Sequence, residues 1–295
     1  MLELVTELGI PFGIFVLMLI AGTEMTIGDF GRLVKRPEAA LIGIFGQLVM
    51  LPPLSFLISA ATAAGSFVTT AVLLIALCPG GPISNNYCYL ARCNVSLSAT
   101  ITAVGTLGCL VSIPFWLKLM SGLAPLDSGL LHIPPSRILG QLVGLMVLPM
   151  ALGMTIARLL RHFVERRKVT FRSVSFAIIL AIFLVTAWAV RDEAFALFRD
   201  IFLTAVLFIL GAMLLGRIMA HRMKPVEQPV LVIESAVRNI GVALIVGRGV
   251  FEEQSFAKFV TFLTGYFIVE IVVMIPYTQF VRARLAMLRS GAQRG

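Results

Sequence analysis

The stretch Leu77-Cys-Pro-Gly-Gly-Pro-Ile-Ser-Asn-Asn86 interrupts a long apolar segment. Two prolines that flank two glycines cannot continue a regular helix, because proline removes a backbone donor and glycine disfavours the helical conformation. Pro82 is well placed to begin a second half-helix, where a missing N–H costs little. Backbone groups freed at membrane depth are tolerated only around a cavity or inside protein. The stretch therefore predicts a broken helix at a site, with a simple proline kink as the alternative.

A second stretch, Ile233-Glu-Ser-Ala-Val-Arg-Asn239, places Glu234, Arg238 and Asn239 near the middle of another apolar segment. A charge inside a membrane costs about 2.5–3.5 kcal/mol on insertion scales, and such residues commonly mark a substrate or ion pathway. The alternative is a static ion pair, because Glu234 and Arg238 lie four residues apart, on one face of a continuous helix.

The whole chain has the composition of a membrane protein. Of its 295 residues 59% are hydrophobic and 13% are charged, and the mean hydropathy is +0.98; soluble domains average about 45–50% apolar and about 25% charged residues. These values exclude a soluble enzyme, a disordered chain and a secreted disulfide scaffold. The net charge of +9 lies in short gaps between apolar segments, which indicates membrane topology rather than nucleic-acid binding. We expect an all-α, polytopic membrane protein.

Nine segments have the length and apolar character of membrane-spanning helices, given that about 20 residues cross the hydrocarbon core. They are Leu8–Met25, Ala39–Ala60, Val68–Ala91, Val95–Met120, Ile138–Ile156, Val174–Ala189, Ile201–Met219, Pro229–Val246 and Phe259–Phe280.

Basic residues predict the orientation of these segments. With the N-terminus outside, 17 of the 24 Lys and Arg residues fall on the inner side and six on the outer side, and Arg238 lies within the membrane. The positive-inside rule therefore predicts a multi-pass protein of the cell membrane with a cytoplasmic C-terminus. The two interrupted segments then run in opposite directions, which is typical of the inverted repeats of secondary transporters, whose sites lie where such helices cross.

At these residues the chain resembles the bile acid:sodium symporter family. The family usually has Glu-Ser-Gly-x-Gln-Asn where Glu234 to Asn239 stand here. The resemblance covers Phe15 to Phe280 and rests also on Cys78–Asn85, on Tyr89–Ser98 with Thr102, and on Gly22–Phe30. A neighbouring arsenite-efflux family usually has a proline before a functional cysteine, whereas Cys78 precedes Pro79 here.

The resemblance implies a single transporter unit over residues 1–295, with a core domain and a panel domain that rock against one another. The core would comprise residues 39–120 and 201–281, and the panel residues 8–37 and 138–190. Nine helices, including two discontinuous crossing helices, would match the nine-helix members of the family.

The resemblance also implies a first sodium site, formed by the side chains of Ser84, Asn85, Ser98, Thr102 and Glu234. The chemistry fits, because sodium is a hard cation and all five side chains offer oxygen. Ser98 and Thr102 lie four residues apart on one helix face, although ordinary hydrogen bonding between helices is the alternative for that pair alone.

A second sodium site in the family corresponds to Gln47, the carbonyl groups of Ser235 and Val237, and a motif glutamine that is Arg238 here. Arginine has only donors, so it cannot ligate sodium. Two sodium ions with one glutamate carry the same net charge as one sodium ion with Arg238 and Glu234. We therefore hypothesise that Arg238 replaces the second sodium with a fixed charge, which leaves coupling to one sodium ion or to none.

Substrate contacts are predicted less clearly. Pro82 and Ile83 occupy the region of the family's substrate contacts, and Asn239 keeps the motif asparagine. Arg238 is a further candidate, since its planar fork suits a carboxylate. Glu270, near the middle of the ninth segment, could pair with Arg238 or carry a proton, because burial favours a neutral carboxyl group; a polar contact between helices is the alternative.

We expect a secondary active transporter rather than an enzyme, which moves a small carboxylate-like organic anion across the lipid bilayer by alternating access. Na⁺ would drive it through the retained site; proton-coupled or cation-independent transport, with Arg238 in place of the second sodium, is the alternative. An intramembrane hydrolase would need a nucleophile with a base in reach, and no histidine lies deep in a segment. A non-transporting receptor on the same fold is a third class. Neither nucleic acid nor an obligate protein partner is expected.

Overall fold

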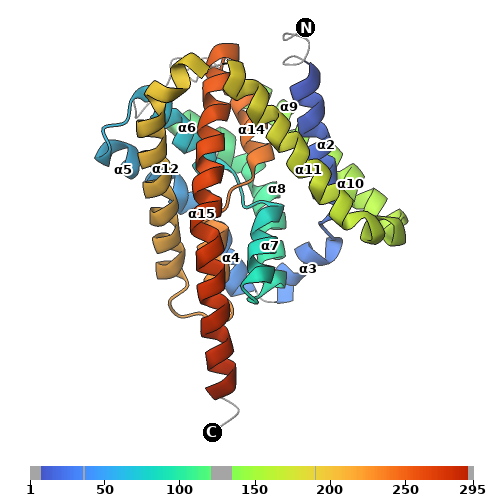
Figure 1. Cartoon of the computed structure of the whole chain (residues 1–295). Coiled ribbons are helices and arrows are strands. Elements are labelled where there is room, and N and C mark those ends of the chain that lie inside the picture. The colour runs from blue at the N-terminus through green and yellow to red at the C-terminus, as the bar shows by residue number, and fades with distance from the viewer. Residues whose placement is uncertain (1–7, 36, 121–134, 190, 292–295) are drawn as a thin grey trace. The chain divides into compact units, whose positions relative to one another are not determined.

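The computed structural model describes residues 8–35, 37–120, 135–189 and 191–291, and these ranges form helices without any strand (Figure 1). The all-α prediction is confirmed for them. The predicted sides of the two termini stay a prediction, because residues 1–7 and 292–295 lie outside the described ranges.

The chain divides into two compact units. Unit 1 comprises Met1–Thr26, Pro114–Arg199 and Ile240–Thr264, and unit 2 comprises Ile27–Ile113, Asp200–Asn239 and Gly265–Gly295. The expected core and panel differ from this division in three places: residues 27–37, expected in the panel, lie in unit 2, and residues 114–120 and 240–264, expected in the core, lie in unit 1. The assignment of core and panel as moving domains stays a prediction.

Unit 1 is built around one helix pair. Its elements are α2 (Ile10–Thr23), α9 (Pro135–Leu142), the π-turn η4 (Val143–Val147), α10 (Leu148–Leu159), α11 (Arg161–Ala189) and α14 (Ile240–Val250). α10 packs along α2, and α14 packs against α9 and α2. A side chain at Gly153 would overlap the main-chain oxygen of Leu19, so only glycine allows α10 to approach α2 this closely.

Unit 2 holds the two motifs that the sequence analysis singled out. Its elements are α3 (Ile27–Lys35), α4 (Pro37–Phe45), the π-turn η2 (Gly46–Met50), α5 (Leu51–Ala61), α6 (Ser66–Leu77), α7 (Pro82–Leu90) and α13 (Gln228–Ala236). Three long helices pass from one unit to the other: α8 (Val95–Met120), α12 (Arg191–Met219) and α15 (Glu253–Gly291), the long red helix of Figure 1.

Two half-helices form the interior of unit 2. α6 is buried on every side from Val68 to Leu77, and α13 is buried on every side from Pro229 to Ala236. Both segments are apolar around their whole circumference apart from a few polar groups, as expected for helices surrounded by protein. A polar side chain on either one therefore faces protein rather than lipid.

Both predicted helix breaks are present. α6 ends at Leu77 and α7 begins at Pro82, with an angle of 70° between them. α13 ends at Ala236, and Val237 is extended. The two breaks meet, because the Asn239 N–H donates to the main-chain oxygen of Pro79 at 2.9 Å. The alternative of a simple kink is wrong for the first break, since Cys78 and Gly81 are both extended.

Seven described helices are long and apolar enough to cross a membrane, and the bent pair α6–α7 brings the number to eight. The first predicted segment, Leu8–Met25, forms the 14-residue helix α2, which is shorter than the roughly 20 residues that span the hydrocarbon core. The count of nine spans and the inverted repeat therefore stay predictions.

Candidate functional site

Glu234 is the centre of a buried polar cluster in unit 2, and only 1% of its surface is exposed. Its Oε1 accepts hydrogen bonds from Ser84 Oγ at 2.5 Å, from Ser98 Oγ at 2.5 Å and from Thr102 Oγ1 at 3.2 Å. Its Oε2 accepts from Gln47 Nε2 at 2.9 Å and lies 3.3 Å from Thr102 Oγ1. We call these five residues the Glu234 cluster. It joins one negative centre to four neutral polar groups.

Two helices bring the hydroxyl groups of the cluster together. Ser84 lies in the first turn of α7, which begins at Pro82, while Ser98 and Thr102 lie one turn apart on α8. The Ser84 oxygen is 3.5 Å from the Ser98 oxygen and 3.4 Å from the Thr102 oxygen. Both members of the Ser98–Thr102 pair therefore reach the same carboxylate, on α13, and their role in sodium binding stays a prediction.

Gln47 connects the cluster to both helix breaks. Its Nε2 also donates to the main-chain oxygen of Glu234 at 3.1 Å, and its Oε1 accepts from the Gly80 N–H at 3.2 Å. Gln47 lies in the π-turn η2, just before Pro52. Proline removes a helical donor, and π-turns are frequent at functional sites.

Gly80 allows the carboxylate to lie against the first break. A Cβ atom at this position would overlap Glu234 Oε2 and would come within 3.1 Å of Gln47 Nε2. Any larger residue would displace the carboxylate or the break.

Asn85 follows Ser84 on α7 and completes the five residues predicted for a first sodium site. The structure brings four of the five together, and it gives no hydrogen bond between Asn85 and the cluster. Asn85 Oδ1 is buried and accepts no hydrogen bond from any described residue. A buried acceptor without a donor is unusual, and a cation would satisfy it.

The donor set favours a hard monovalent cation. All the predicted ligands offer oxygen, and only one of them carries a charge. No group of three His, Cys, Asp or Glu residues that could hold a metal ion occurs among the described residues.

Arg238 lies in the second break and is 2% exposed. Its guanidinium donates to three main-chain oxygens: Nη1 to Cys78 at 2.9 Å, Nε to Val237 at 3.2 Å, and Nη2 to Glu234. These carbonyl groups lie at or just beyond the C-terminal ends of α6 and α13, which carry partial negative charge. The side chains of Glu234 and Arg238 are close enough to interact electrostatically, but the guanidinium binds the main-chain oxygen of Glu234, and no ion pair between the two side chains occurs among the described residues.

Glu270 lies on α15 and is fully buried. Neither of its carboxyl oxygens has a hydrogen-bond partner among the described residues. Arg238 is close enough to interact electrostatically with it, but the guanidinium is directed at carbonyl groups. One turn earlier on α15, the Tyr266 hydroxyl donates to the main-chain oxygen of Ala236 at 2.5 Å.

The remaining predicted residues surround the meeting point of the breaks. Ser235 is buried, and the Val237 carbonyl is occupied by Arg238. Asn239 is buried, while Pro82 and Ile83 are half-buried at the start of α7. A Cβ atom on Gly81 would lie 3.1 Å from Asn239 Cα, so the start of α7 and Asn239 are neighbours.

Sequence reasoning missed three contributors to this site. They are the carbonyl group of Cys78, the N–H of Gly80 and the hydroxyl of Tyr266. The first two are backbone groups without a residue signature. Tyr266 could have been found as a polar aromatic residue one turn from Glu270 in an apolar segment.

A comparison with known families identifies the chain. The model of the Sodium Bile acid symporter family matches residues 11–196. The chain belongs to the Sodium Bile acid symporter family. The predicted family is therefore confirmed. The match ends before α13, so Glu234, Arg238 and Glu270 lie beyond the matched residues.

Several relatives share part of this sequence. A rice protein, Probable sodium/metabolite cotransporter BASS2, chloroplastic, is 31% identical over 155 residues, which cover 52% of this chain and 35% of the rice protein. The Uncharacterized sodium-dependent transporter YocS of Bacillus subtilis (strain 168) is 24% identical over 81% of this chain and 74% of its own length. The human Ileal sodium/bile acid cotransporter is 26% identical over 69% of this chain and 58% of its own length. The chain thus spans about a third of the rice relative and just over half of the human one.

Proposed function

We propose that this chain is a secondary active transporter that moves a small organic anion together with one sodium ion. The observation that carries the proposal is the Glu234 cluster, a single buried carboxylate ringed by hydroxyl groups where two broken helices meet. Membership of a sodium symporter family and the names of the relatives support the same function.

Sodium would bind as a co-substrate among the oxygens of Ser84, Asn85, Ser98, Thr102 and Glu234. The hydroxyl groups of Ser98 and Thr102 donate to Glu234, and that of Ser84 lies within hydrogen-bond distance of both Glu234 Oε1 and the Gly81 carbonyl oxygen. Rotation about their C–O bonds would turn lone pairs toward a cation instead. Glu234 supplies the opposite charge, and Asn85 Oδ1 supplies an acceptor that is already unpaired.

Arg238 would act as the fixed counterpart of a second sodium ion. It already neutralises the carbonyl groups of Cys78, Glu234 and Val237, which include groups that a second cation would need. Gln47 and Ser235 would then have a structural role beside it. The proposed cycle carries one sodium ion for each substrate molecule.

The substrate would be a small carboxylate. Arginine has five N–H donors, of which three are used here, so two remain for a ligand. The start of α7, at Pro82 and Ile83, presents the positive end of a helix close to Asn239. Both features favour a negative group at the crossing.

Transport would proceed by alternating access, with residues 39–120 and 201–281 as the core and residues 8–37 and 138–190 as the panel. We place the protein in the cell membrane with the N-terminus outside and the C-terminus in the cytoplasm, because basic residues gather on the inner side.

A second candidate is coupling to protons. It is favoured by Glu270, a buried carboxyl group whose oxygens have no hydrogen-bond partner among the described residues. In that case a proton gradient would stimulate uptake. Glu270→Gln would abolish this stimulation, but uptake measured in the absence of a gradient would be unchanged.

Uptake by reconstituted protein tests the function. Proteoliposomes would receive a panel of labelled mono- and dicarboxylates and a bile acid, with an inward gradient of sodium or of potassium. We expect the sodium gradient to stimulate uptake of at least one anion, and we expect Glu234→Gln to remove that stimulation. Glu252→Gln, which removes an exposed carboxylate in unit 1, is the matched control.

Two outcomes would contradict the proposal. If folded wild-type protein takes up none of the anions but binds one of them, a receptor is the better description. If uptake occurs equally in sodium and potassium and survives Glu234→Gln, the Glu234 cluster is not a cation site.

A further inference from the structure

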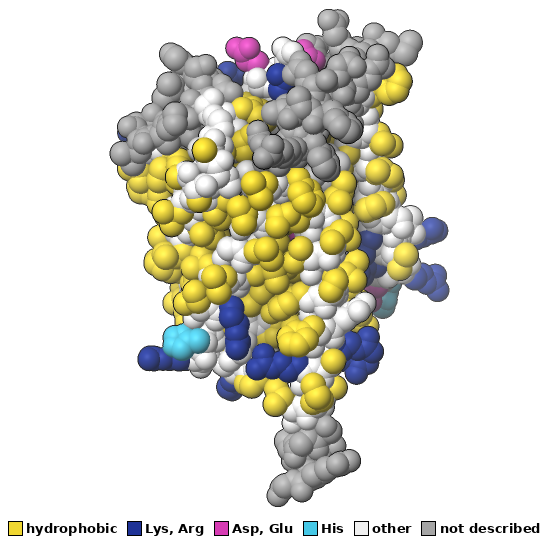
Figure 2. Space-filling model, turned by 60° about the vertical axis from the view of Figure 1, so that its left-hand side comes forward, with side chains coloured by type: hydrophobic (Ala, Val, Ile, Leu, Met, Phe, Trp, Pro, Cys, Tyr) yellow, Lys and Arg dark blue, Asp and Glu magenta, His cyan; other side chains and the backbone are white. Residues whose placement is uncertain are grey.

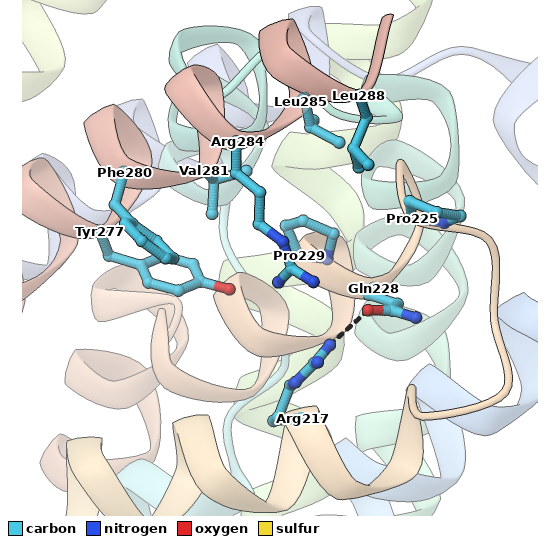
Figure 3. A pocket seen from close by; sticks show the side chains of 10 residues that line it. All are labelled: Arg217, Pro225, Gln228, Pro229, Tyr277, Phe280, Val281, Arg284, Leu285 and Leu288. Atoms are coloured by element: carbon cyan, nitrogen blue, oxygen red, sulfur yellow. Dashed lines mark hydrogen bonds between the residues drawn. The ribbon is translucent and has the colours of Figure 1, made fainter. Parts of the chain in front are cut away.

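A cavity of about 110 Å³ lies in unit 2, at the start of α13, and none of its lining residues belongs to the Glu234 cluster. The end of α12, the start of α13 and the C-terminal part of α15 form its walls. Figure 3 shows the side chains of Arg217 and Arg284 reaching into one space, with the hydroxyl of Tyr277 directed toward it.

The cavity is basic and has no counter-charge in its walls. None of the described residues that line it is acidic. Arg217 donates to Gln228 Oε1, and Arg284 forms no ion pair or hydrogen bond with a described residue. Two like charges that converge without a carboxylate leave a place for an anion, and arginine suits the oxygens of a phosphate group.

The other walls of the cavity are apolar. Val281 and Leu285 are buried, whereas Phe280 is 62% exposed and Leu288 is 49% exposed. All four lie on α15 at spacings that place them along one side of a helix. An exposed apolar edge beside a basic pocket is the complement of an amphiphile.

The position of the cavity fits a membrane interface. In Figure 2, Lys and Arg side chains gather below a broad hydrophobic surface, at the end where α15 leads to the C-terminus. Basic pockets between membrane helices bind lipid headgroups. In the predicted orientation, Arg217 and Arg284 are among the 17 basic residues on the inner side, where anionic lipid headgroups attract basic residues.

We propose that this cavity binds the phosphate headgroup of an anionic phospholipid. Arg217 and Arg284 hold the phosphate, and the acyl chains run along Phe280 and Leu288. A free phosphate ion shares the charged part of this chemistry but would leave the apolar edge without a partner. The site shares no residue with the Glu234 cluster, so it does not depend on the transport proposal.

The test is a lipid titration of the purified full chain in detergent, followed by native mass spectrometry. The probes are phosphatidylglycerol, phosphatidylcholine and inorganic phosphate. We expect wild-type protein to retain phosphatidylglycerol in preference to phosphatidylcholine. Arg217→Gln with Arg284→Gln should weaken this binding at least about tenfold, since each basic residue near the surface contributes to attraction of anionic lipid.

Two further variants keep the test specific. Arg282→Gln removes the same charge from an exposed position two residues from Arg284 that does not line the cavity, and it should bind as the wild type does. Arg217→Lys with Arg284→Lys keeps the charge but loses the planar fork. Its affinity for phosphatidylglycerol should lie between that of the wild type and that of the double glutamine variant. Elution of each variant as a single species on size exclusion shows that it is folded.

Three results would overturn the proposal: equal loss of phosphatidylglycerol in Arg282→Gln and in the double glutamine variant, equal retention of phosphatidylcholine by the wild type, or displacement of phosphatidylglycerol by millimolar inorganic phosphate. The last result would identify a free anion as the occupant.

Discussion

Arg238 Nη1 donates to the main-chain oxygen of Cys78 at 2.9 Å, and this contact joins the ends of two half-helices that lie 160 residues apart in the chain. A cation would interact favourably with the same carbonyl groups, because helix C-termini carry partial negative charge. The guanidinium thus places a permanent positive charge at a position where a mobile cation could otherwise bind and dissociate.

Replacing Arg238 should change the number of sodium ions in the cycle. Arg238→Gln frees the carbonyl groups and restores an acceptor, so we expect the Hill coefficient for sodium in uptake to rise from one to a value above one. Arg238→Lys keeps the charge and should keep a coefficient of one. A coefficient that is the same in wild type and in Arg238→Gln would refute the fixed-charge proposal.

Removing one hydroxyl group from the Glu234 cluster should weaken sodium binding, while a valine in place of threonine keeps the size and shape of the side chain. Hydrogen bonds to charged groups contribute about 1.5–3 kcal/mol, so Thr102→Val should raise the sodium concentration for half-maximal uptake by at least about tenfold. Thr100→Val is the control, because Thr100 is also buried on α8 but bonds to Ser96 of its own helix. If both variants shift equally, position 102 has no special relation to sodium.

A methyl group at Gly80 should abolish sodium-stimulated uptake. The Cβ atom would overlap Glu234 Oε2, and overpacking of this kind typically costs about 1–3 kcal/mol of stability. Gly31→Ala is the comparison within unit 2, since nothing lies within 4 Å of the atom that it would add. Uptake by Gly80→Ala at the wild-type rate would show that the carboxylate does not need its present position.

The two buried carboxyl groups should respond differently to conversion into amides. In Glu234→Gln the amide oxygen can still accept from Gln47 Nε2, but the amide nitrogen replaces the charged acceptor of the three hydroxyl groups, and we expect a loss of about 1–3 kcal/mol. In Glu270→Gln no side-chain hydrogen bond to a described residue is lost, so thermal stability should equal or exceed that of the wild type.

Thermal unfolding in detergent at one neutral pH compares the two amide variants. A lower melting temperature for Glu270→Gln than for Glu234→Gln would contradict the assignment of Glu234 as the hydrogen-bonded member and Glu270 as the unpaired one.

The breaks and the hydroxyl groups could be predicted from the sequence, because each has a local cause. Pro79 and Pro82 with their glycines end α6, and the spacing of Ser98 and Thr102 sets one face of α8. The bonding of Arg238 could not be predicted in this way. The pairing of residues four apart assumes a continuous helix, whereas α13 ends at Ala236, before Arg238 is reached.

The π-turn that carries Gln47 has a signal in the sequence. Pro52 and Pro53 follow η2, and Pro149 follows the corresponding turn η4 in unit 1. A proline in the next turn leaves earlier carbonyl groups without their usual donor, so a widened turn just before it is a natural response. The contacts between distant segments, such as Gln47 with Gly80, depend on tertiary packing that single-sequence patterns do not encode.

The side-chain amide of Gln47 is hydrogen-bonded to both helix breaks: its nitrogen donates to Glu234, and its oxygen accepts from Gly80. If a bound ion shifts the Glu234 carboxylate, Gln47 would pass that shift to the first helix break at Gly80. Binding of the ion and movement of the two helix breaks would then be coupled.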